Sequence, residues 1–359
     1  MKHWQETSLL LDEAARAAGA GRRTALATVV RILGSTYRRP GAKLLVADDG
    51  AVSGGVSGGC LEDDVREVAL GVLRGAPPAL RRYDTGGDEQ QVWGLGLGCD
   101  GMVEVFVERL DGRGAVAARA RKLLAGDRPF AIATLVAGPG AGAALLLEED
   151  ATVTGSTGDA ALDRTIAATA RAQLGAGTTG VVEIGARRLF VEVLEPPPRL
   201  IICGAGDDAR PLAALATSAG FRVTVADHRP AYLVADRFPA GVRLVQARPE
   251  EGIEAFAQTA GTFVVIQTHS LTHDKHWARS AATSAACYVG LLGPRERGQK
   301  LLEELPPAAR RRVFTPVGLD LGAEGPEQIA VSIVAELLAV HTGRPPRHLR
   351  ERDGAIHAG

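Results

Sequence analysis

Apolar residues in the first half of the chain alternate between helical and strand-like spacing. Leu9, Leu10, Ala14, Ala17 and Ala18 recur at helical spacing with charged residues between them, which predicts an amphipathic opening helix. Further helices are predicted at 61–73 and 160–174. Mostly apolar runs predict strands at 24–33, 42–47, 51–53, 101–110, 130–136, 143–147 and 181–184. No internal repeat is evident, and the mixture is typical of an α+β domain.

The pattern changes after three consecutive prolines, 196–198, which can continue neither a helix nor a central strand. Beyond them, apolar runs alternate with helical patterns, which favours a parallel sheet with crossover helices. These segments are 200–203, 208–218, 222–226, 262–266, 273–283 and 288–291. We therefore expect an α/β protein of two domains. An α+β domain spans 1–195, a Rossmann-type doubly wound domain spans 199–342, and a flexible tail spans 343–359.

The turn after the first strand of the second domain matches the dinucleotide-binding pattern GxGxxA. Gly204 permits the tight turn, Gly206 lets a pyrophosphate approach the backbone, and Ala209 lets helix and sheet pack closely. Asp227 follows the next predicted strand, about 20 positions further on, where an acidic residue takes ribose hydroxyls. We expect Asp227 to face the two glycines and to contact a ribose if a nucleotide binds.

Two acidic residues within this turn argue against dinucleotide binding. Asp207 and Asp208 place carboxylates at the helix start, where a phosphate would otherwise collect amide donors. They could cap the helix instead. A Rossmann fold that has lost its ligand therefore remains the alternative.

A glycine-rich loop in the first domain ends at a cysteine. The loop comprises Ser57, Gly58, Gly59, Cys60, Leu61 and Glu62. The predicted helix start favours a thiolate at Cys60, and glycine-rich backbone exposes donors to a phosphate, a pterin edge or a metal. Glu62, Asp63 and Asp64 oppose both effects by their charge. The alternative is that Cys60 only fills space in the core.

A second loop of this type, 94–101, contains Cys99. If the two loops converge, Cys60 and Cys99 line one pocket. Cys203 and Cys287 lie within apolar strand patterns, where a core role is expected.

Composition limits the classes of partner. The 41 basic and 42 acidic residues give a net charge of −1, so no overall field attracts nucleic acid or a membrane surface. No apolar run approaches the ~20 residues of a membrane span, and no signal peptide is recognisable. Four cysteines without a CxxC pair fit a reducing compartment. We expect a cytoplasmic protein.

A polar cluster follows the strand 262–266. Its members are His269, His273, Asp274 and His276. Their spacing could supply ligands to a metal ion. Such a cluster more often lies on the surface, caps a helix or forms the lip of a nucleotide pocket. His269 is expected at the carboxyl edge of the sheet. Arg295 and Arg297 could contact phosphate or lie on a solvated helix face.

Taken together, the motifs resemble the XdhC/CoxI family of accessory proteins for xanthine dehydrogenase and related molybdenum hydroxylases. The matching segments, in the family's order, are 34–35, 39–46, 57–62, 204–212, 227–230, 237–239, 268–269, 274, 288–295 and 316–322. The resemblance implies a non-catalytic chaperone that binds the molybdenum cofactor, protects it during sulfuration by a separate cysteine desulfurase and delivers it to a hydroxylase apo-enzyme. Asp100 after Cys99 departs from the Gly-Cys-Gly-Gly that is common in the family, which weakens the inference for the second loop.

The motif matches and the loop chemistry together predict the cofactor-binding residues. They are Ser57, Gly58, Gly59, Cys60, Glu62, Cys99, Gly204, Gly206, Asp207, Asp227, His228, Arg229, His269 and Gly293. Whether the cofactor is the pterin or a dinucleotide form, and whether the chain forms a homodimer, stay open. The alternative function is an NAD(P)-dependent oxidoreductase, for which only His269 or His273 could transfer a proton.

Overall fold

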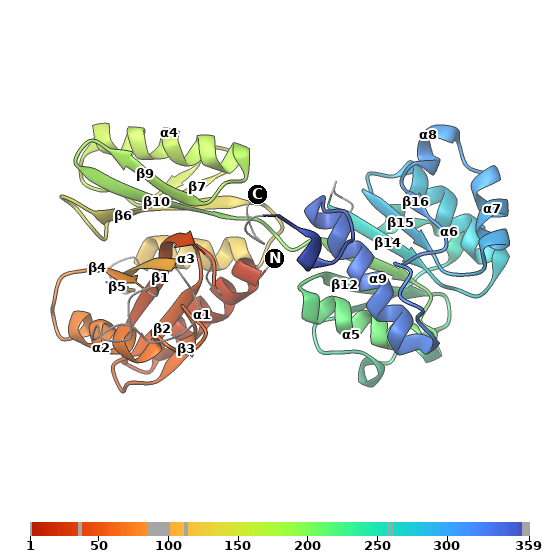
Figure 1. Cartoon of the computed structure of the whole chain (residues 1–359), viewed down its shortest axis with the longest axis horizontal. Helices are drawn as coiled ribbons and strands as arrows, with labels where there is room; N and C mark the ends of the chain where they lie inside the picture. The colour runs from red at the N-terminus through yellow and green to blue at the C-terminus, as the bar shows by residue number, and fades with distance from the viewer. Residues whose placement is uncertain are drawn as a thin grey trace. The chain divides into compact units, whose positions relative to one another are not determined.

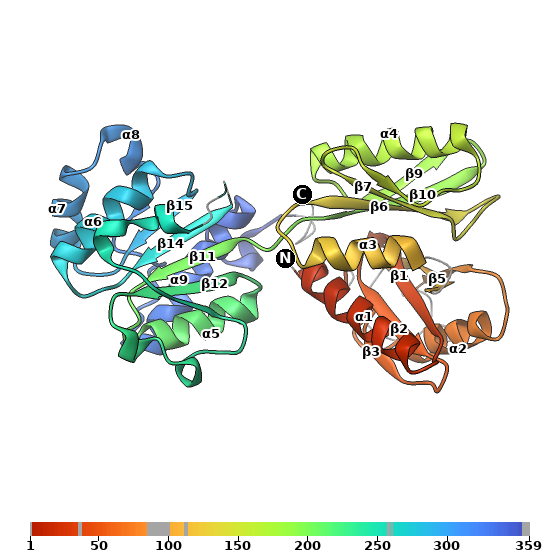
Figure 2. The same ribbon diagram turned by 180° about the vertical axis from the view of Figure 1, so that it is seen from behind.

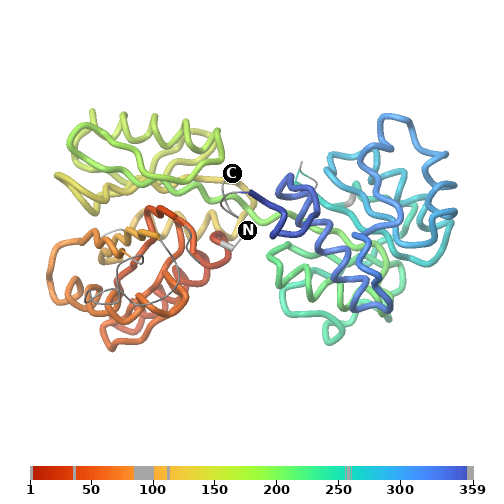
Figure 3. Tube along the Cα trace, in the orientation of Figure 1, coloured from red at the N-terminus to blue at the C-terminus, as the bar shows by residue number. Residues whose placement is uncertain are grey.

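The structure is a computed structural model that describes residues 2–34, 38–84, 101–110, 114–256, 259 and 261–353. Its contacts divide the chain into two compact units, with the boundary between Pro196 and Pro197 (Figures 1 and 3). Each unit contains its own sheets and its own clusters of buried apolar residues. No helix among the described residues is long and apolar enough to cross a membrane.

Two antiparallel sheets form the N-terminal unit. The elements of the first are α1 (Lys2–Gly19), β1 (Thr24–Gly34), β2 (Lys43–Ala47), β3 (Val52–Gly54), α2 (Glu62–Leu73), β4 (Ala79–Asp84) and β5 (Gly101–Arg109). Those of the second are α3 (Gly114–Leu124), β6 (Phe130–Ala137), β7 (Ala144–Glu148), β8 (Val153–Thr154), α4 (Ala160–Ala176), β9 (Gly180–Ile184) and β10 (Arg187–Leu194). The strand orders are β3-β2-β1-β5-β4 and β8-β7-β6-β10-β9.

These two sheets are structural repeats. Both follow the order helix, three strands, helix, two strands, and both have the same strand arrangement. In the first, Ala27 pairs with Leu44 and Val107, and in the second Ala133 pairs with Leu145 and Val191. Aligned on this register, ALATVV at 25–30 matches AIATLV at 131–136, and VFVE at 105–108 matches LFVE at 189–192. The expectation that the chain has no internal repeat was wrong.

Equivalent residues of the two repeats meet at the centre of the unit. A buried cluster joins Val30 and Phe106 to their counterparts Val136 and Phe190, as an approximate twofold relation between the sheets would produce. The helices α1 and α3 pack into the space between the sheets, whereas α2 and α4 cover the outer faces (Figure 2). The central strands β1 and β6 are therefore buried on both faces over most of their length, which explains their nearly continuous apolar runs.

The C-terminal unit has one parallel sheet covered by helices on both faces. Its strands are β11 (Arg199–Cys203), β12 (Arg222–Asp227), β13 (Arg243–Gln246), β14 (Thr262–Ile266), β15 (Tyr288–Leu291) and β16 (Val313–Phe314). Its α-helices are α5 (Ala209–Ala219), α6 (Leu271–Thr283), α7 (Arg295–Glu303), α8 (Pro307–Arg310) and α9 (Gly325–Thr342). The strand order β13-β12-β11-β14-β15-β16 is that of a doubly wound Rossmann sheet. The predicted fold class, α+β followed by Rossmann, is confirmed.

Candidate functional site

The glycine turn of the Rossmann unit connects β11 to α5. Gly204 has φ +111°, and a Cβ there would lie 2.7 Å from the carbonyl oxygen of Gln267, at the end of β14. Only glycine therefore fits where the turn passes the neighbouring strand. Its N–H donates to the carbonyl of Ala226 at 2.8 Å, which ties the turn to β12. The turn, the following helix and Asp227 at the end of β12 lie where the sequence pattern predicts them.

The Asp227 side chain is 2% exposed, and both of its oxygens are engaged. It accepts hydrogen bonds from the N–H of Ala205 at 2.7 Å, from the N–H of Arg229 at 2.9 Å, and from Nε and Nη2 of Arg229 at 3.0 and 2.9 Å. Burial would raise the pKa of Asp227, but the hydrogen bonds from Arg229 and Ala205 lower it to about 2. The ionised carboxylate thus fastens the glycine turn to the end of β12.

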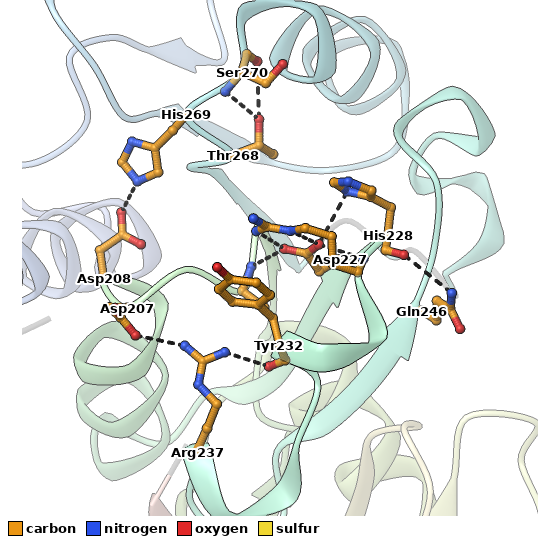
Figure 4. Close-up of polar contacts among 12 residues, drawn as sticks. Asp207, Asp208, Asp227, His228, Tyr232, Arg237, Gln246, Thr268, His269 and Ser270 are labelled. Carbon is orange, nitrogen blue, oxygen red and sulfur yellow. Dashed lines mark hydrogen bonds and ion pairs between the residues drawn. The ribbon is translucent and has the colours of Figure 1, made fainter.

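Asp207 and Asp208 do not cap α5 as the sequence suggested. No side-chain capping hydrogen bond is present at this helix start. Asp207 instead pairs with Arg237 at 2.9 Å, and Asp208 Oδ2 lies 2.9 Å from Nε2 of His269, as Figure 4 shows. Each carboxylate therefore reaches a loop that follows a strand of the sheet.

The second oxygen of Asp208 lies against the glycine turn. A Cβ on Gly206 would be 2.8 Å from Asp208 Oδ1, so this oxygen occupies the space that a side chain at Gly206 would take. Oδ1 is buried and has no hydrogen-bond partner among the described residues. His269, which holds the other oxygen, has φ +58°, an uncommon backbone conformation for a non-glycine residue. The Asp208–His269 pair therefore covers the face of Gly206 that a pyrophosphate needs in dinucleotide-binding domains.

A cavity of about 200 Å³ opens beside this turn at the carboxyl edge of the sheet. Its lining residues come from the turn after β11, the end of β12 and the β14–α6 connection, and they are Gly204, Ala226, Asp227, His228, Arg229, Thr268, Ser270, His273 and Trp277. The rings of His228 and His273 meet edge to face, 4.8 Å between centroids. His228 and Arg229, which only the family motif singled out, thus share a cavity with His273.

The other candidates around this edge do not gather into a metal site. Asp274 is buried and binds Thr268 and Arg297, so Arg297 is neither a surface residue nor a free phosphate ligand. Gly293 lies beside Arg297, where its Cβ would approach Cδ at 3.3 Å. His276 lines a separate groove, next to α6 and the short helix η4 (Pro249–Glu251). Within the described part of the chain, no three His, Cys, Asp or Glu side chains could hold a metal ion.

In the loop before α2 of the N-terminal unit, side chains of the loop accept hydrogen bonds from its own backbone N–H groups. The hydroxyl of Ser57 accepts the N–H groups of Gly59, Cys60 and Leu61, each at 3.1 Å. Glu62 accepts the N–H groups of Val56, Ser57 and Leu61 at 3.2, 2.9 and 3.1 Å, and also the hydroxyl of Ser57. Burial would raise the pKa of Glu62, but these hydrogen bonds lower it. The loop is therefore held by its own carboxylate and hydroxyl.

Cys60 lies half-buried in this loop. Its thiol is 3.5 Å from the hydroxyl of Ser57, and its side chain packs against the core beneath α2. Gly58 lies exposed in the bend of the loop. Cys99 and the rest of the second glycine loop lie outside the described residues, so their relation to Cys60 stays a prediction.

The second repeat contains the equivalent loop without a cysteine. A Cβ at Gly54 or at its counterpart Gly155 would lie 2.4 Å from the carbonyl oxygen of the facing strand in both repeats. From these glycines the alignment continues without a gap, so that Asp163 corresponds to Glu62 and Ala161 to Cys60. Asp163 binds the N–H and the hydroxyl of Thr157 at 2.8 and 2.6 Å. The two repeats thus share the glycine and the carboxylate, whereas the position of Cys60 is taken by Ala161 inside α4.

The remaining cysteines behave differently from each other. Cys203 is fully buried in β11, and burial raises the pKa of its thiol, as expected for a core residue. Cys287 is half-buried just before β15 and donates to the carbonyl of Thr262 at 3.3 Å.

Comparison with known proteins gives similarity over nearly the whole chain. Residues 200–337 match the XdhC Rossmann domain, and residues 17–84 and 123–185 match the XdhC and CoxI family, one segment in each repeat. A protein of Bacillus subtilis that is named as a probable subunit of xanthine dehydrogenase is 34% identical over 87% of this chain and 92% of its own length. The "Molybdenum cofactor insertion chaperone PaoD" of Escherichia coli is 24% identical over 94% of this chain and 93% of its own. A crystal structure described as a xanthine dehydrogenase from Bacillus halodurans superposes with a TM-score of 0.76 at 28% identity, over 94% of this chain and 96% of the other.

Proposed function

The chain belongs to the XdhC and CoxI family, and we propose that it is a maturation factor that binds the molybdenum cofactor, assists its sulfuration and inserts it into a molybdenum hydroxylase. The observation that carries this proposal is the similarity to the insertion chaperone PaoD over both units. The relative from Bacillus subtilis, whose name links it to xanthine dehydrogenase, supports a xanthine dehydrogenase-like or CO dehydrogenase-like partner. The cysteine desulfurase is a separate partner in this scheme, and the chain itself need not catalyse a reaction.

The geometry supports a binding role at the edge of the Rossmann sheet. Gly204, Asp227, His228 and Arg229 line a cavity large enough for several water molecules, with polar groups from three loops facing it. Ligands of open α/β sheets bind at this edge. The cofactor is here a cargo, and the proposed task of these side chains is to hold and release it.

The Cys60 loop is the second proposed contact with the cofactor. The alignment of the repeats places Ala161 opposite Cys60, but Ala161 lies inside α4, whereas Cys60 lies in the loop before α2. A half-buried cysteine in a loop at a helix start fits a role in chemistry, such as protecting the cofactor while sulfur is transferred. Glu62 and Ser57 shape the loop that presents it.

An NAD(P)-dependent oxidoreductase is the weaker alternative. The strand order and the glycine turn favour it. Against it, Asp208 covers Gly206, and the oxygens of Asp227 already accept hydrogen bonds from Ala205 and Arg229. A ribose contact by Asp227 would require these bonds to rearrange, so the usual dinucleotide pose is not supported by the geometry.

The maturation role is tested by reconstituting an apo-hydroxylase with molybdenum cofactor and sulfide source in the presence or absence of the purified chain. We expect a higher yield of active hydroxylase and retention of the cofactor on the chain during gel filtration. A parallel titration with NADH separates the alternatives. Tight NADH binding together with no effect on hydroxylase activation would reject the maturation role in favour of an oxidoreductase.

A further inference from the structure

The polar groups at the Rossmann edge are arranged differently from those of a dinucleotide-binding turn. In a dinucleotide-binding domain the second glycine lies under the pyrophosphate. Here Asp208 Oδ1 takes the space next to Gly206, and His269 holds the other carboxylate oxygen. A diphosphate in that place would meet the carboxylate at contact distance, and like charges at this distance repel strongly in a partly buried site.

The adjoining cavity offers hydrogen-bond donors instead. Arg229 uses Nε and Nη2 on Asp227, which leaves Nη1 without a hydrogen bond to any described residue. His228 Nδ1 lies 3.3 Å from the Asp227 carboxylate, which can only accept, so His228 Nε2 is a donor when the imidazole carries both protons. Neither ring nitrogen of His273 forms a hydrogen bond within the described chain. The hydroxyl of Ser270 lines the same cavity.

Two of the negative charges next to this cavity are paired with arginines. Asp227 is paired with Arg229, and the buried Asp274 behind Thr268 is paired with Arg297. An anion that enters therefore meets one unused guanidinium nitrogen and two imidazoles rather than an unpaired carboxylate. Guanidinium and imidazole groups around a small polar cavity are donors that suit a phosphate dianion.

From this arrangement we propose that the cavity bounded by His228, Arg229 and His273 is a phosphate-monoester site and that Asp208 excludes a diphosphate bridge from the neighbouring turn. The ligand class is thus a compound that ends in a single phosphate, rather than a dinucleotide in the usual pose. The inference deepens the proposed function, because molybdenum cofactor without an attached nucleotide ends in a phosphate monoester. Only this link to the cofactor rests on the proposed function.

The site is tested with the full chain and without molybdenum cofactor. Ribose 5-phosphate, inorganic phosphate and ADP-ribose are titrated by calorimetry at constant ionic strength. We expect ribose 5-phosphate to bind at least about tenfold more tightly than ADP-ribose. One additional well-made contact is enough to produce this factor of about ten. Absence of ribose 5-phosphate and phosphate binding at millimolar concentrations, or tighter binding of ADP-ribose, would overturn the proposal.

Two pairs of variants locate the site. His273→Gln should weaken ribose 5-phosphate binding about tenfold, whereas His276→Gln, at a residue that lines a separate groove, should leave it unchanged. Asp208→Ser should strengthen ADP-ribose binding at least about tenfold, and Asp236→Ser, which removes an exposed carboxylate nearby, should not. Equal affinities within either pair would contradict the assignment, and thermal melts check that each variant is folded.

The phosphate titrations test the phosphate site, and the hydroxylase assay tests the maturation role separately. Lost phosphate binding with normal hydroxylase activation would reject the phosphate site and keep the maturation role. Phosphate binding with no effect on any hydroxylase would keep the site and reject the maturation role.

Discussion

Asp163 in the second repeat of the N-terminal unit holds the position of Glu62 in the first, and each carboxylate binds the backbone and hydroxyl groups of the loop before its helix. The common part of the two loops is therefore structural. The part that differs, Cys60 against Ala161, is where a function specific to one repeat can reside.

We expect Cys60→Ala to keep the fold but lose cofactor retention or hydroxylase activation. Alanine lacks only the thiol of this half-buried side chain, so the free energy of unfolding should fall by only about 1 kcal/mol. Hydroxylase reconstitution measures the function, and a thermal melt measures the fold. Cys287→Ala is the matched control, because it removes another half-buried cysteine far along the chain from this loop. Full activation by Cys60→Ala would leave the cysteine as packing only.

Asp227→Asn should destabilise the C-terminal unit in a pH-dependent way. The pKa of Asp227 is lowered from 3.8 to about 2 by Arg229 and the N–H of Ala205, which corresponds to about 2 kcal/mol of folding free energy. Because the folded-state pKa is the lower one, this contribution is present above about pH 4 and disappears as the pH falls toward 2. Urea unfolding at pH 7 and near pH 3 should show that the wild type loses about half of its advantage over Asp227→Asn at the lower pH.

An equal difference between the two proteins at both pH values would show that the carboxylate contributes through shape rather than charge. Arg222→Gln, a substitution at the other end of β12, should retain the wild-type response to pH in this range.

The sequence predicted the Rossmann unit well because its signals are local. A glycine turn, a following helix and an acidic residue after the next strand lie close together in the chain, and they lie together in the structure. The actual role of Asp208 could not be predicted in this way. It depends on His269, which reaches the turn from the β14–α6 connection, far away in sequence.

The N-terminal unit was harder to predict because charged residues interrupt its strands. The strand β10 was missed since Arg188 and Glu192 break its apolar pattern, yet Arg188 pairs with Glu104 at 2.6 Å and Glu192 pairs with Lys43 inside the unit. The repeat was also hidden. The connections between equivalent strands differ in length, so equivalent residues do not recur at a constant interval.

We expect the two units to fold independently when produced as residues 1–196 and 197–353. Each has its own buried clusters and closes its own sheets, so neither needs the other for a core. Each fragment should show a cooperative thermal transition and sharp, dispersed amide resonances. A fragment that remains unfolded alone but folds when its partner is added would show that the division between the units is not a domain boundary.

The buried ion pair between Lys43 and Glu192 joins the two repeats, and its loss should be costly. The Lys43 side chain is 4% exposed, that of Glu192 is 6% exposed, and Lys43 also donates to the carbonyl of Gly41 at 2.9 Å. Lys43→Met leaves a carboxylate buried without its cation, which should reduce the free energy of unfolding by about 3–5 kcal/mol. Lys43→Met combined with Glu192→Leu should recover most of that loss, because two apolar side chains need no compensation. Urea unfolding of the isolated N-terminal fragment measures both values. If the double variant were as unstable as Lys43→Met alone, the pair would be needed for the packing of the repeats rather than to neutralise a buried charge.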